Sequence, residues 1–223
     1  MIPSRFLFRF QVPCFFTPTL WTAKGLTLGE SHRLPSVAEL EDPTHTVPFE
    51  LRTGWNNEGI AFSLTVFGKK QQAWCRPVHP DESDGLHLCL DTRNIHDVHR
   101  ATRFCHRLAF LPFGSGPNQN DPSVVWLPIH RAKGHPNPIS TKLFKLFSRT
   151  TANGYRLDIL LPGNQLTGFD PEEHPRLGFH FVVVDRELGN HTFLVGPPLP
   201  HDQDPSLWGT LELRFPTAEE RRN

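Results

Sequence analysis

The amino-acid sequence predicts an all-β protein, a two-sheet antiparallel β-sandwich of the immunoglobulin or jelly-roll kind with very little helix. Apolar residues alternate with polar ones in many short runs, which is the pattern of half-buried strands. The 22 prolines and 16 glycines divide the chain into short pieces, and this favours strands over long helices. No segment carries a sustained helical period. A chain of 223 residues lies in the range where such a sandwich forms one domain.

The N-terminal quarter of the chain predicts one strand and a long connection. Alternate phenylalanines from Phe6 to Phe10 indicate an opening strand at period two. Residues 29–48 are polar and interrupted by proline, which is typical of a connecting loop. We therefore expect residues 1–54 to form an N-terminal strand and a Pro-rich connecting segment of the same domain, and residues 55–223 to form the main sandwich.

Regular strand signals begin at Trp55. Pro128 places one of these strands at a sheet edge, because proline cannot donate a ladder hydrogen bond. A single helical turn is expected at residues 164–166. The predicted strands cover residues 60–66, 86–90, 104–110, 124–130, 143–147, 157–161, 179–183 and 210–215. The side chains expected in the core are Leu88, Phe181, Val183, Leu211 and Leu213.

Charge and hydropathy exclude several classes of partner. The 23 basic and 23 acidic residues cancel, and no basic stripe is interleaved with aromatic residues, so we expect no nucleic-acid partner. No apolar run reaches the roughly 18 residues that a membrane span needs. Arg9 interrupts the apolar N-terminal stretch and no small-residue cleavage site follows closely, so we expect no signal peptide and a cytoplasmic protein.

The sequence carries none of the common catalytic motifs, neither a GxSxG elbow, an HExxH pair nor a glycine-rich phosphate loop. Cys105 and His106 are neighbours on a predicted strand, so their side chains point to opposite faces and cannot act as nucleophile and base. Paired carboxylates for glycoside hydrolysis stay open, because their spacing is spatial. We expect no catalysis. The four cysteines form no CxxC pair, and their spacing leaves the disulfide state open.

Several stretches cover most of the chain after Trp55: WNNEGIAFSLTVFGK at 55–69, DGLHLCLDTR at 84–93, RATRFCHRLAFLP at 100–112, GYRLDILLP at 154–162, RLGFHFVVVDRELG at 176–189 and DPSLWGTLEL at 204–213. Taken in order, they resemble the family 9 carbohydrate-binding modules and the DOMON-related ligand-binding sandwiches. The order of the stretches and the closing DPSLWGTLEL pattern together make the resemblance specific. The resemblance implies an all-β scaffold that binds a saccharide without turning it over.

The resemblance also implies where a sugar would bind. The family clamps a sugar ring between two tryptophans, and the matching positions here hold Asp81 and Asp202. The family's polar sugar contacts match His87, Cys105 and Arg107. A carboxylate cannot replace an aromatic ring under the C–H face of a sugar, so most of the known sugar site is missing.

Strand alternation nevertheless predicts a candidate ligand-binding face. His87, Arg103 and Arg107 are expected on a single concave surface, with Asp81 offsetting the charge of the arginines. Trp74 or His79, in the loop leading to this face, would supply a displaced aromatic platform. We expect the ligand to be a saccharide or an acidic sugar, the latter because arginine binds carboxylates in a bidentate manner. The alternative is a structural or protein-interaction sandwich that binds no sugar.

Two metal sites are also considered. His96 and His99 are three residues apart and would share a metal if their loop were helical, whereas solvated or carbonyl-bonded histidines are the plainer interpretation. Calcium sites occur in the resembled family, so the resemblance implies structural calcium on carboxylates such as Asp84, Asp91, Asp185 and Glu187. Haem ligation through methionine is not expected, because Met1 is the only methionine.

Overall fold

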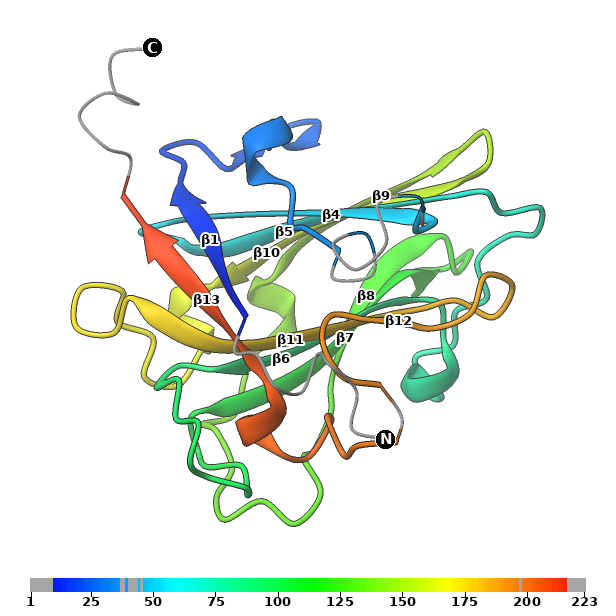
Figure 1. Cartoon of the computed structure of the whole chain (residues 1–223). Helices are drawn as coiled ribbons and strands as arrows, with labels where there is room; N and C mark the ends of the chain where they lie inside the picture. The colour runs from blue at the N-terminus through cyan, green and yellow to red at the C-terminus, as the bar shows by residue number, and fades with distance from the viewer. Residues whose placement is uncertain (1–9, 37–38, 40–43, 45, 197, 216–223) are drawn as a thin grey trace.

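The computed structural model describes residues 10–36, 39, 44, 46–196 and 198–215 (Figure 1). Eleven strands form one continuous mixed sheet, and β2 and β3 form a separate hairpin. Along the large sheet the strand order is β8-β7-β6-β11-β13-β1-β4-β5-β10-β9, with β12 paired to β11. The strands are β1 (Gln11–Phe16), β2 (Trp21–Thr22), β3 (Gly25–Leu26), β4 (Phe49–Asn56), β5 (Gly59–Phe67), β6 (Gly85–Asp91), β7 (Cys105–Ser115), β8 (Asp121–Trp126), β9 (Lys145–Thr151), β10 (Gly154–Pro162), β11 (Arg176–Val184), β12 (His191–Thr192) and β13 (Gly209–Arg214).

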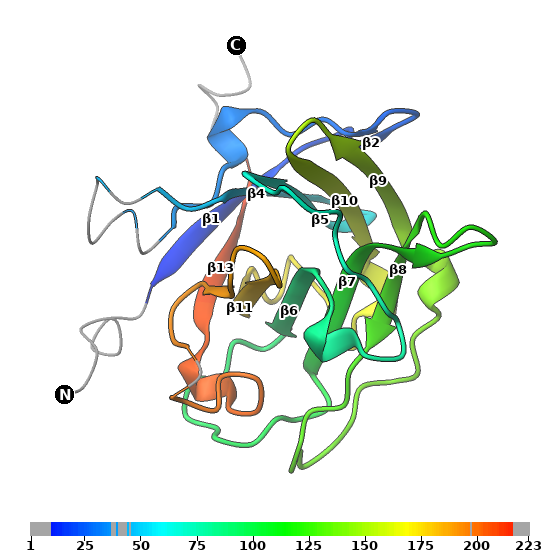
Figure 2. The ribbon, with the colours of Figure 1, turned by 90° about the vertical axis from the view of Figure 1, so that its right-hand side faces the viewer.

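The all-β prediction is confirmed, but the prediction of two separate antiparallel sheets is wrong. β1 pairs in parallel with β13 on one side and with β4 on the other, and so joins the two halves into one sheet. The sheet then curves until its end strands β8 and β9 contact each other, as the view in Figure 2 shows. An alternating sequence suits parallel and antiparallel neighbours alike, so the pattern alone could not show this connection.

The core fills the interior between the two halves of the curved sheet. Phe62 of β5 stacks on Phe179 of β11, with ring centroids 5.8 Å apart, and so connects the two halves of the curved sheet. Both rings are completely buried. The five core side chains expected from the sequence, Leu88, Phe181, Val183, Leu211 and Leu213, are all buried in the same cluster.

The N-terminal quarter differs from its prediction. Phe6 and Phe8 lie outside the described residues, and the first described strand begins later, at Gln11. β4, which begins at Phe49, lies largely in the part assigned to a connecting segment. Alternate side chains from Phe49 to Trp55 face the core. This alternation was missed in the sequence because polar residues precede it. β8 is an edge strand, as expected, but it ends at Trp126, before Pro128.

Helical structure in the described residues consists mainly of short 3-10 turns. One of them is close to the helical turn expected at residues 164–166. In the part of the chain that the structure describes, no helix has the length and apolar character needed to cross a membrane. The turns are η2 (Glu30–His32), η3 (Pro80–Glu82), η4 (Thr141–Leu143), η5 (Gly163–Gln165) and η6 (Pro205–Leu207).

Candidate functional site

A cavity of about 690 Å³ lies on the outer face of β6, β7 and β11. Its volume is in the range of small-molecule sites. Its wall opposite the sheet comes from residues 198–203, which follow β12 in the chain. We refer to this cavity as the sheet pocket. The residues that line it are Asp81, His87, Cys89, Arg107, His180, Val182, Val184, Asn190, Thr192, Pro198, Leu199, Pro200, His201, Asp202 and Gln203.

Strand pairing positions the floor of the sheet pocket. His180 of β11 lies opposite Cys89 of β6, and Cys89 lies opposite Arg107 of β7. One step along the sheet, Val182 lies opposite His87. Because alternate residues of a strand share a face, these side chains point outward while their neighbours fill the core. The register therefore places two histidines, a thiol and a guanidinium on one face of the sheet, in two neighbouring rows.

The opposite wall is a proline-rich turn anchored to the C-terminal part of the fold. Trp208 Nε1 donates a hydrogen bond to the carbonyl oxygen of His201 at 2.7 Å, and Trp208 itself is buried. The backbone N–H groups of Gln203 and Asp204 both donate to the carbonyl of Pro200. This wall is thus built from a folded turn rather than an extended linker, and it keeps His201 and Asp202 beside the sheet.

Arg107 is the centre of charge in the sheet pocket. Its guanidinium donates to Asp81 Oδ1 at 2.6 Å and lies 3.7 Å from Asp202 Oδ2. Asp81 therefore offsets the arginine, and Asp202 from the opposite wall does so as well. One cation with two carboxylates leaves the pocket with a formal charge of minus one when its histidines are neutral.

The histidines of the floor are held in their neutral form. Burial, together with the nearby Arg107 charge, lowers the pKa of His87 to about 4, and burial lowers the pKa of His180 to about 3. His87 Nε2 lies 3.1 Å from the carbonyl oxygen of Pro80. Neither ring nitrogen of the completely buried His180 has a hydrogen-bond partner among the described residues. His201 packs against it with ring centroids 4.9 Å apart.

The thiol in the floor is unsuited to nucleophilic chemistry. Burial raises the pKa of Cys89 to about 12, so the thiol stays protonated at neutral pH. Cys105 and His106 point to opposite faces of β7: Cys105 packs in a satellite cluster with Trp208, and His106 Nε2 accepts from the backbone N–H of Thr167. All four cysteines are free.

The structure brings together three of the six residues predicted for the ligand site, namely His87, Arg107 and Asp81. Arg103 lies in the loop before β7, because the strand begins only at Cys105, and its guanidinium lies 4.9 Å from the Phe104 ring centroid. The predicted pair of arginines on one strand face is therefore not formed.

The two predicted platform residues lie outside the sheet pocket. Trp74 borders a different cavity, and the Arg186 guanidinium lies over its ring, 4.3 Å from the centroid. His79 is exposed and precedes η3, where its carbonyl accepts from Ser83 Oγ. Neither residue therefore provides the predicted aromatic platform in the sheet pocket.

His180, His201 and Cys89 were not predicted as site residues. His180 could have been found, since it alternates with Phe179 and Phe181, and two buried phenylalanines place the residue between them on the other face. His201 lies in an irregular turn, where no periodicity exists to read.

The residues proposed for metal binding are committed to other partners. Asp91 accepts from the backbone N–H groups of Arg93 and Ile95. His96 lies 3.2 Å from Thr210 Oγ1, whereas His99 lies 3.2 Å from Asp204 Oδ2, so the two histidines do not converge. Within the described residues, no group of three or more His, Cys, Asp or Glu side chains could hold a metal ion.

The carboxylates considered for calcium do not fit that ion. Asp84 and Asp185 both bind the ammonium group of Lys69, at 3.0 Å and 2.6 Å, and Glu187 lies 3.8 Å from it. We refer to Lys69, Asp84, Asp185 and Glu187 as the salt-bridge group. All of these side chains except Glu187 are almost completely buried. A lysine cation therefore occupies the position between the carboxylates.

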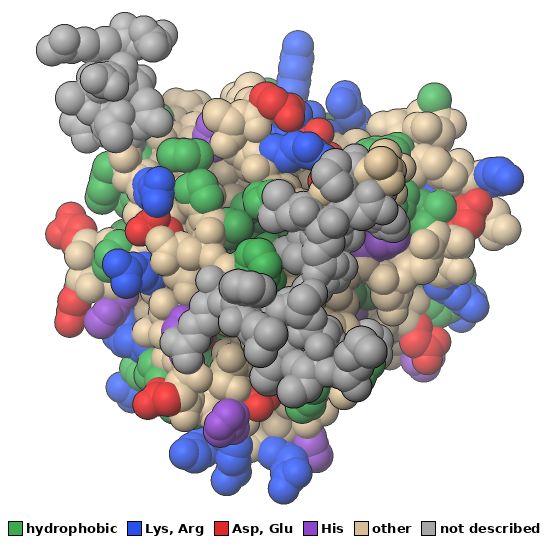
Figure 3. Space-filling model, in the orientation of Figure 1, with side chains coloured by type: hydrophobic (Ala, Val, Ile, Leu, Met, Phe, Trp, Pro, Cys, Tyr) green, Lys and Arg blue, Asp and Glu red, His purple; other side chains and the backbone are tan. Residues whose placement is uncertain are grey.

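The surface charges are mixed in sign. Figure 3 shows acidic and basic side chains interspersed around the margin of one face, in keeping with the formal net charge of zero.

Comparison with known proteins shows the fold. No family model matches the sequence, and no curated protein matches it. A family 9 carbohydrate-binding module from Caldicellulosiruptor kristjanssonii in complex with cellotriose is similar in structure, with a TM-score of 0.60 at 12% identity over 94% of this chain and 96% of that chain. A structure described as the same kind of module from that organism in complex with glucose gives a TM-score of 0.56 at 11% identity, over 93% and 97% of the two chains.

A candidate carbohydrate-binding protein from Bacteroides uniformis is also similar, with a TM-score of 0.52 at 11% identity over 92% of this chain and 99% of that chain. The resemblance read from the sequence is thus confirmed at the level of the fold. The relation to DOMON domains stays a prediction.

Proposed function

We propose that this chain is a non-catalytic saccharide-binding protein and that the sheet pocket is its binding site. The proposal depends mainly on one observation, made on the buried His180 in the pocket floor. Its two ring nitrogens lack a hydrogen-bond partner among the described residues. Leaving a buried polar group unpaired costs about 1–3 kcal/mol. A ligand in the sheet pocket would recover that energy by displacing the His201 ring, which packs on His180, and by hydrogen-bonding to the imidazole in its place.

The protonation state of His180 defines the ligand chemistry. A neutral imidazole offers one N–H donor and one nitrogen acceptor. A hydroxyl group is the natural partner for either, because it both donates and accepts. Val182, Val184 and Pro200 add apolar surface beside these groups, which suits the C–H face of a sugar ring. Hydroxyl groups next to C–H faces are the defining surface of a saccharide.

The charge of the sheet pocket favours a neutral saccharide over an acidic one. Arg107 already binds Asp81 and has Asp202 nearby, so an incoming carboxylate would meet two like charges for one opposite charge. The similar folds in complex with cellotriose and glucose support the same class of ligand.

A protein-interaction sandwich is the second candidate function. The observation that favours it is that Asp81 and Asp202, rather than aromatic residues, border the pocket. Without an aromatic clamp, sugar affinity depends on the polar floor alone.

A glycan array with the purified chain tests the proposal. We expect binding to neutral glycans that is lost in His180→Phe, which keeps an aromatic ring of similar size but removes both nitrogens. His99→Ala, an exposed histidine outside the pocket, is the matched control and should bind as the unaltered chain does. Absence of any neutral-glycan signal would leave the protein-interaction sandwich as the better account.

A further inference from the structure

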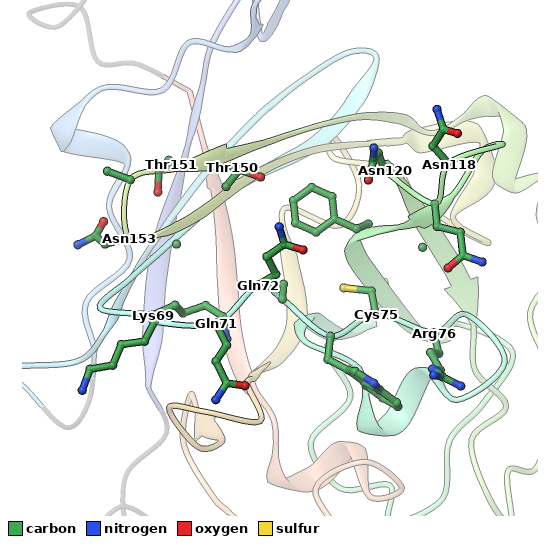
Figure 4. A pocket seen from close by; sticks show the side chains of 18 residues that line it. Lys69, Gln71, Gln72, Cys75, Arg76, Asn118, Asn120, Thr150, Thr151 and Asn153 are labelled. Carbon is green, nitrogen blue, oxygen red and sulfur yellow. The ribbon is translucent and has the colours of Figure 1, made fainter.

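A second cavity, of about 480 Å³, lies where three turns converge (Figure 4). Its walls come from the irregular segment 69–76, from the turn between β7 and β8, and from the turn between β9 and β10. We refer to it as the turn pocket. In Figure 4 Gln72 reaches into the space between the hairpins, with Thr150 on one side and Asn120 on the other. The ring of Phe113 also lines the cavity.

The side chains around the turn pocket are amides, hydroxyls and cations. Neutral hydrogen-bonding groups dominate, and each amide offers both donors and acceptors. No carboxylate is among the lining residues, whereas two lysines and one arginine are. The amides and hydroxyls are those of Gln71, Gln72, Asn118, Gln119, Asn120, Thr150, Thr151 and Asn153.

The charges in the turn pocket are not equivalent. The Lys69 ammonium is neutralised by Asp84 and Asp185 on the inner side. Arg76 and Lys70 form no salt bridge with any described residue, and the Arg76 guanidinium lies 5.4 Å from the centroid of the Trp74 ring. Contact with a ring face leaves the N–H donors of the guanidinium available for bidentate binding of a carboxylate or sulfate.

The wall formed by segment 69–76 is fixed in place although it belongs to no strand. Asp84 Oδ2 accepts from the backbone N–H of Trp74 at 3.0 Å. The Glu187 carboxylate accepts from the N–H groups of Lys70 and Gln71 at 2.9 and 3.0 Å. The N–H of Lys69 donates to the carbonyl of Asn153, across to the opposite turn. A wall held by so many charge-assisted bonds loses little entropy when a ligand binds.

We infer that the turn pocket is a second saccharide site, and that its ligand is an acidic saccharide. The amides bind sugar hydroxyls, Phe113 contributes apolar surface, and Arg76 with Lys70 binds the carboxylate or sulfate group. The two cavities then differ in the charges that line them. The sheet pocket has two aspartates beside one arginine, whereas the turn pocket is lined by no carboxylate, and of its three cations only Lys69 is paired. One chain would thus hold a neutral and an acidic saccharide at separate places.

An array of acidic glycans, carrying uronic acids, sialic acid or sulfate, tests this inference with three variants of the full chain. We expect at least one acidic glycan to bind the unaltered chain and to lose roughly tenfold or more in affinity in Gln72→Ala/Arg76→Ala. Arg149→Ala is the matched control, because it removes the same charge from an exposed position of β9 that does not line the cavity, and it should retain binding.

The third variant, His180→Phe, separates this inference from the proposed function. It should lose neutral glycans and keep acidic ones. The inference is wrong if no acidic glycan binds, or if acidic-glycan binding survives in Gln72→Ala/Arg76→Ala or falls equally in Arg149→Ala. The proposed function fails independently if neutral glycans bind His180→Phe as well as the unaltered chain.

Discussion

The ammonium group of Lys69 donates hydrogen bonds to both oxygens of Asp185, at 2.8 and 2.6 Å, and a third to Asp84 at 3.0 Å. Only 1–2% of each of these side chains is exposed. The remaining oxygen capacity of Asp185 is used by the backbone N–H groups of Glu187 and Leu188. The salt-bridge group therefore ties segment 69–76 to the end of β11.

Lys69→Met should destabilise the fold strongly. It leaves two buried carboxylates without their cation, a loss that costs about 3–5 kcal/mol for buried pairs. We expect a corresponding drop in the free energy of unfolding in urea. Lys70→Met, at the exposed neighbouring position, should change it by less than about 0.5 kcal/mol. Equal effects of the two substitutions would contradict the structural role of Lys69.

Calcium should not stabilise this chain. Lys69 already occupies the space between Asp84 and Asp185, so a cation would have to displace an ammonium group at hydrogen-bond distance from both. We expect the same Tm in excess EDTA and in millimolar calcium. An increase of several degrees with calcium would contradict this prediction, because binding to the folded state raises stability.

The sequence predicted where most strands lie but not how they pair. The alternation within β5, β10, β11 and β13 depends on which face of each strand is buried, and a short stretch of sequence is enough to encode it. The position of β1 between β13 and β4 depends on contacts between residues about 200 positions apart, such as Val12 and Leu211. No local pattern encodes a contact at that separation.

The candidate site was predictable only where a residue lies within a regular strand. His87 and Arg107 could be assigned a face by alternation, and both line the sheet pocket. Arg103 was assigned by extending the same alternation beyond the start of β7, where the chain is irregular. Asp202 and His201 reach the pocket through a turn whose shape depends on tertiary bonds such as that between Trp208 and His201.

Gly85→Ala should be strongly destabilising. Gly85 begins β6 at a φ of +153°, and a Cβ atom there would lie 2.1 Å from the carbonyl oxygen of Phe110. Because that oxygen belongs to the neighbouring strand, the two strands must separate, and we expect a loss above about 2 kcal/mol. Gly189→Ala is the matched control: its φ is +87° but the space around it is open, so only the backbone strain of about 1–2 kcal/mol applies. A smaller loss for Gly85→Ala than for Gly189→Ala in urea unfolding would refute this view of β6.

Acid should weaken the fold before the carboxylates titrate. The pKa values of His87 and His180 are lowered to about 4 and about 3, mainly by burial, from an ordinary value near 6.5. A lowered folded-state pKa means that the unfolded chain binds protons first as the pH falls. Above about pH 6.5 these histidines are neutral in the folded and the unfolded chain, so they do not change the free energy of unfolding. Below that pH the unfolded chain is protonated first, and stability falls toward about pH 4.

Urea unfolding at pH 7.5 and at pH 4.5 measures this acid effect. His180→Phe should lose less stability between the two pH values than the unaltered chain, by roughly 2–3 kcal/mol, since one pKa unit corresponds to 1.36 kcal/mol. His99→Ala, which removes an exposed histidine outside the pocket, is the variant for comparison. An identical pH dependence in His180→Phe and the unaltered chain would mean that His180 is not held neutral by the fold.

Arg107→Ala should abolish neutral-saccharide binding while changing stability by only about 1 kcal/mol. Its partner Asp81 is 60% exposed, and ion pairs with an exposed partner contribute at most about 1 kcal/mol. The loss of the guanidinium would, however, leave Asp81 and Asp202 facing the ligand without a cation between them. Arg103→Ala is the matched control, an arginine of the same chain region that lies outside the sheet pocket, and it should bind neutral glycans normally. If Arg107→Ala unfolds the protein, the arginine is a structural ion-pair partner; if Arg103→Ala loses binding instead, the saccharide lies elsewhere.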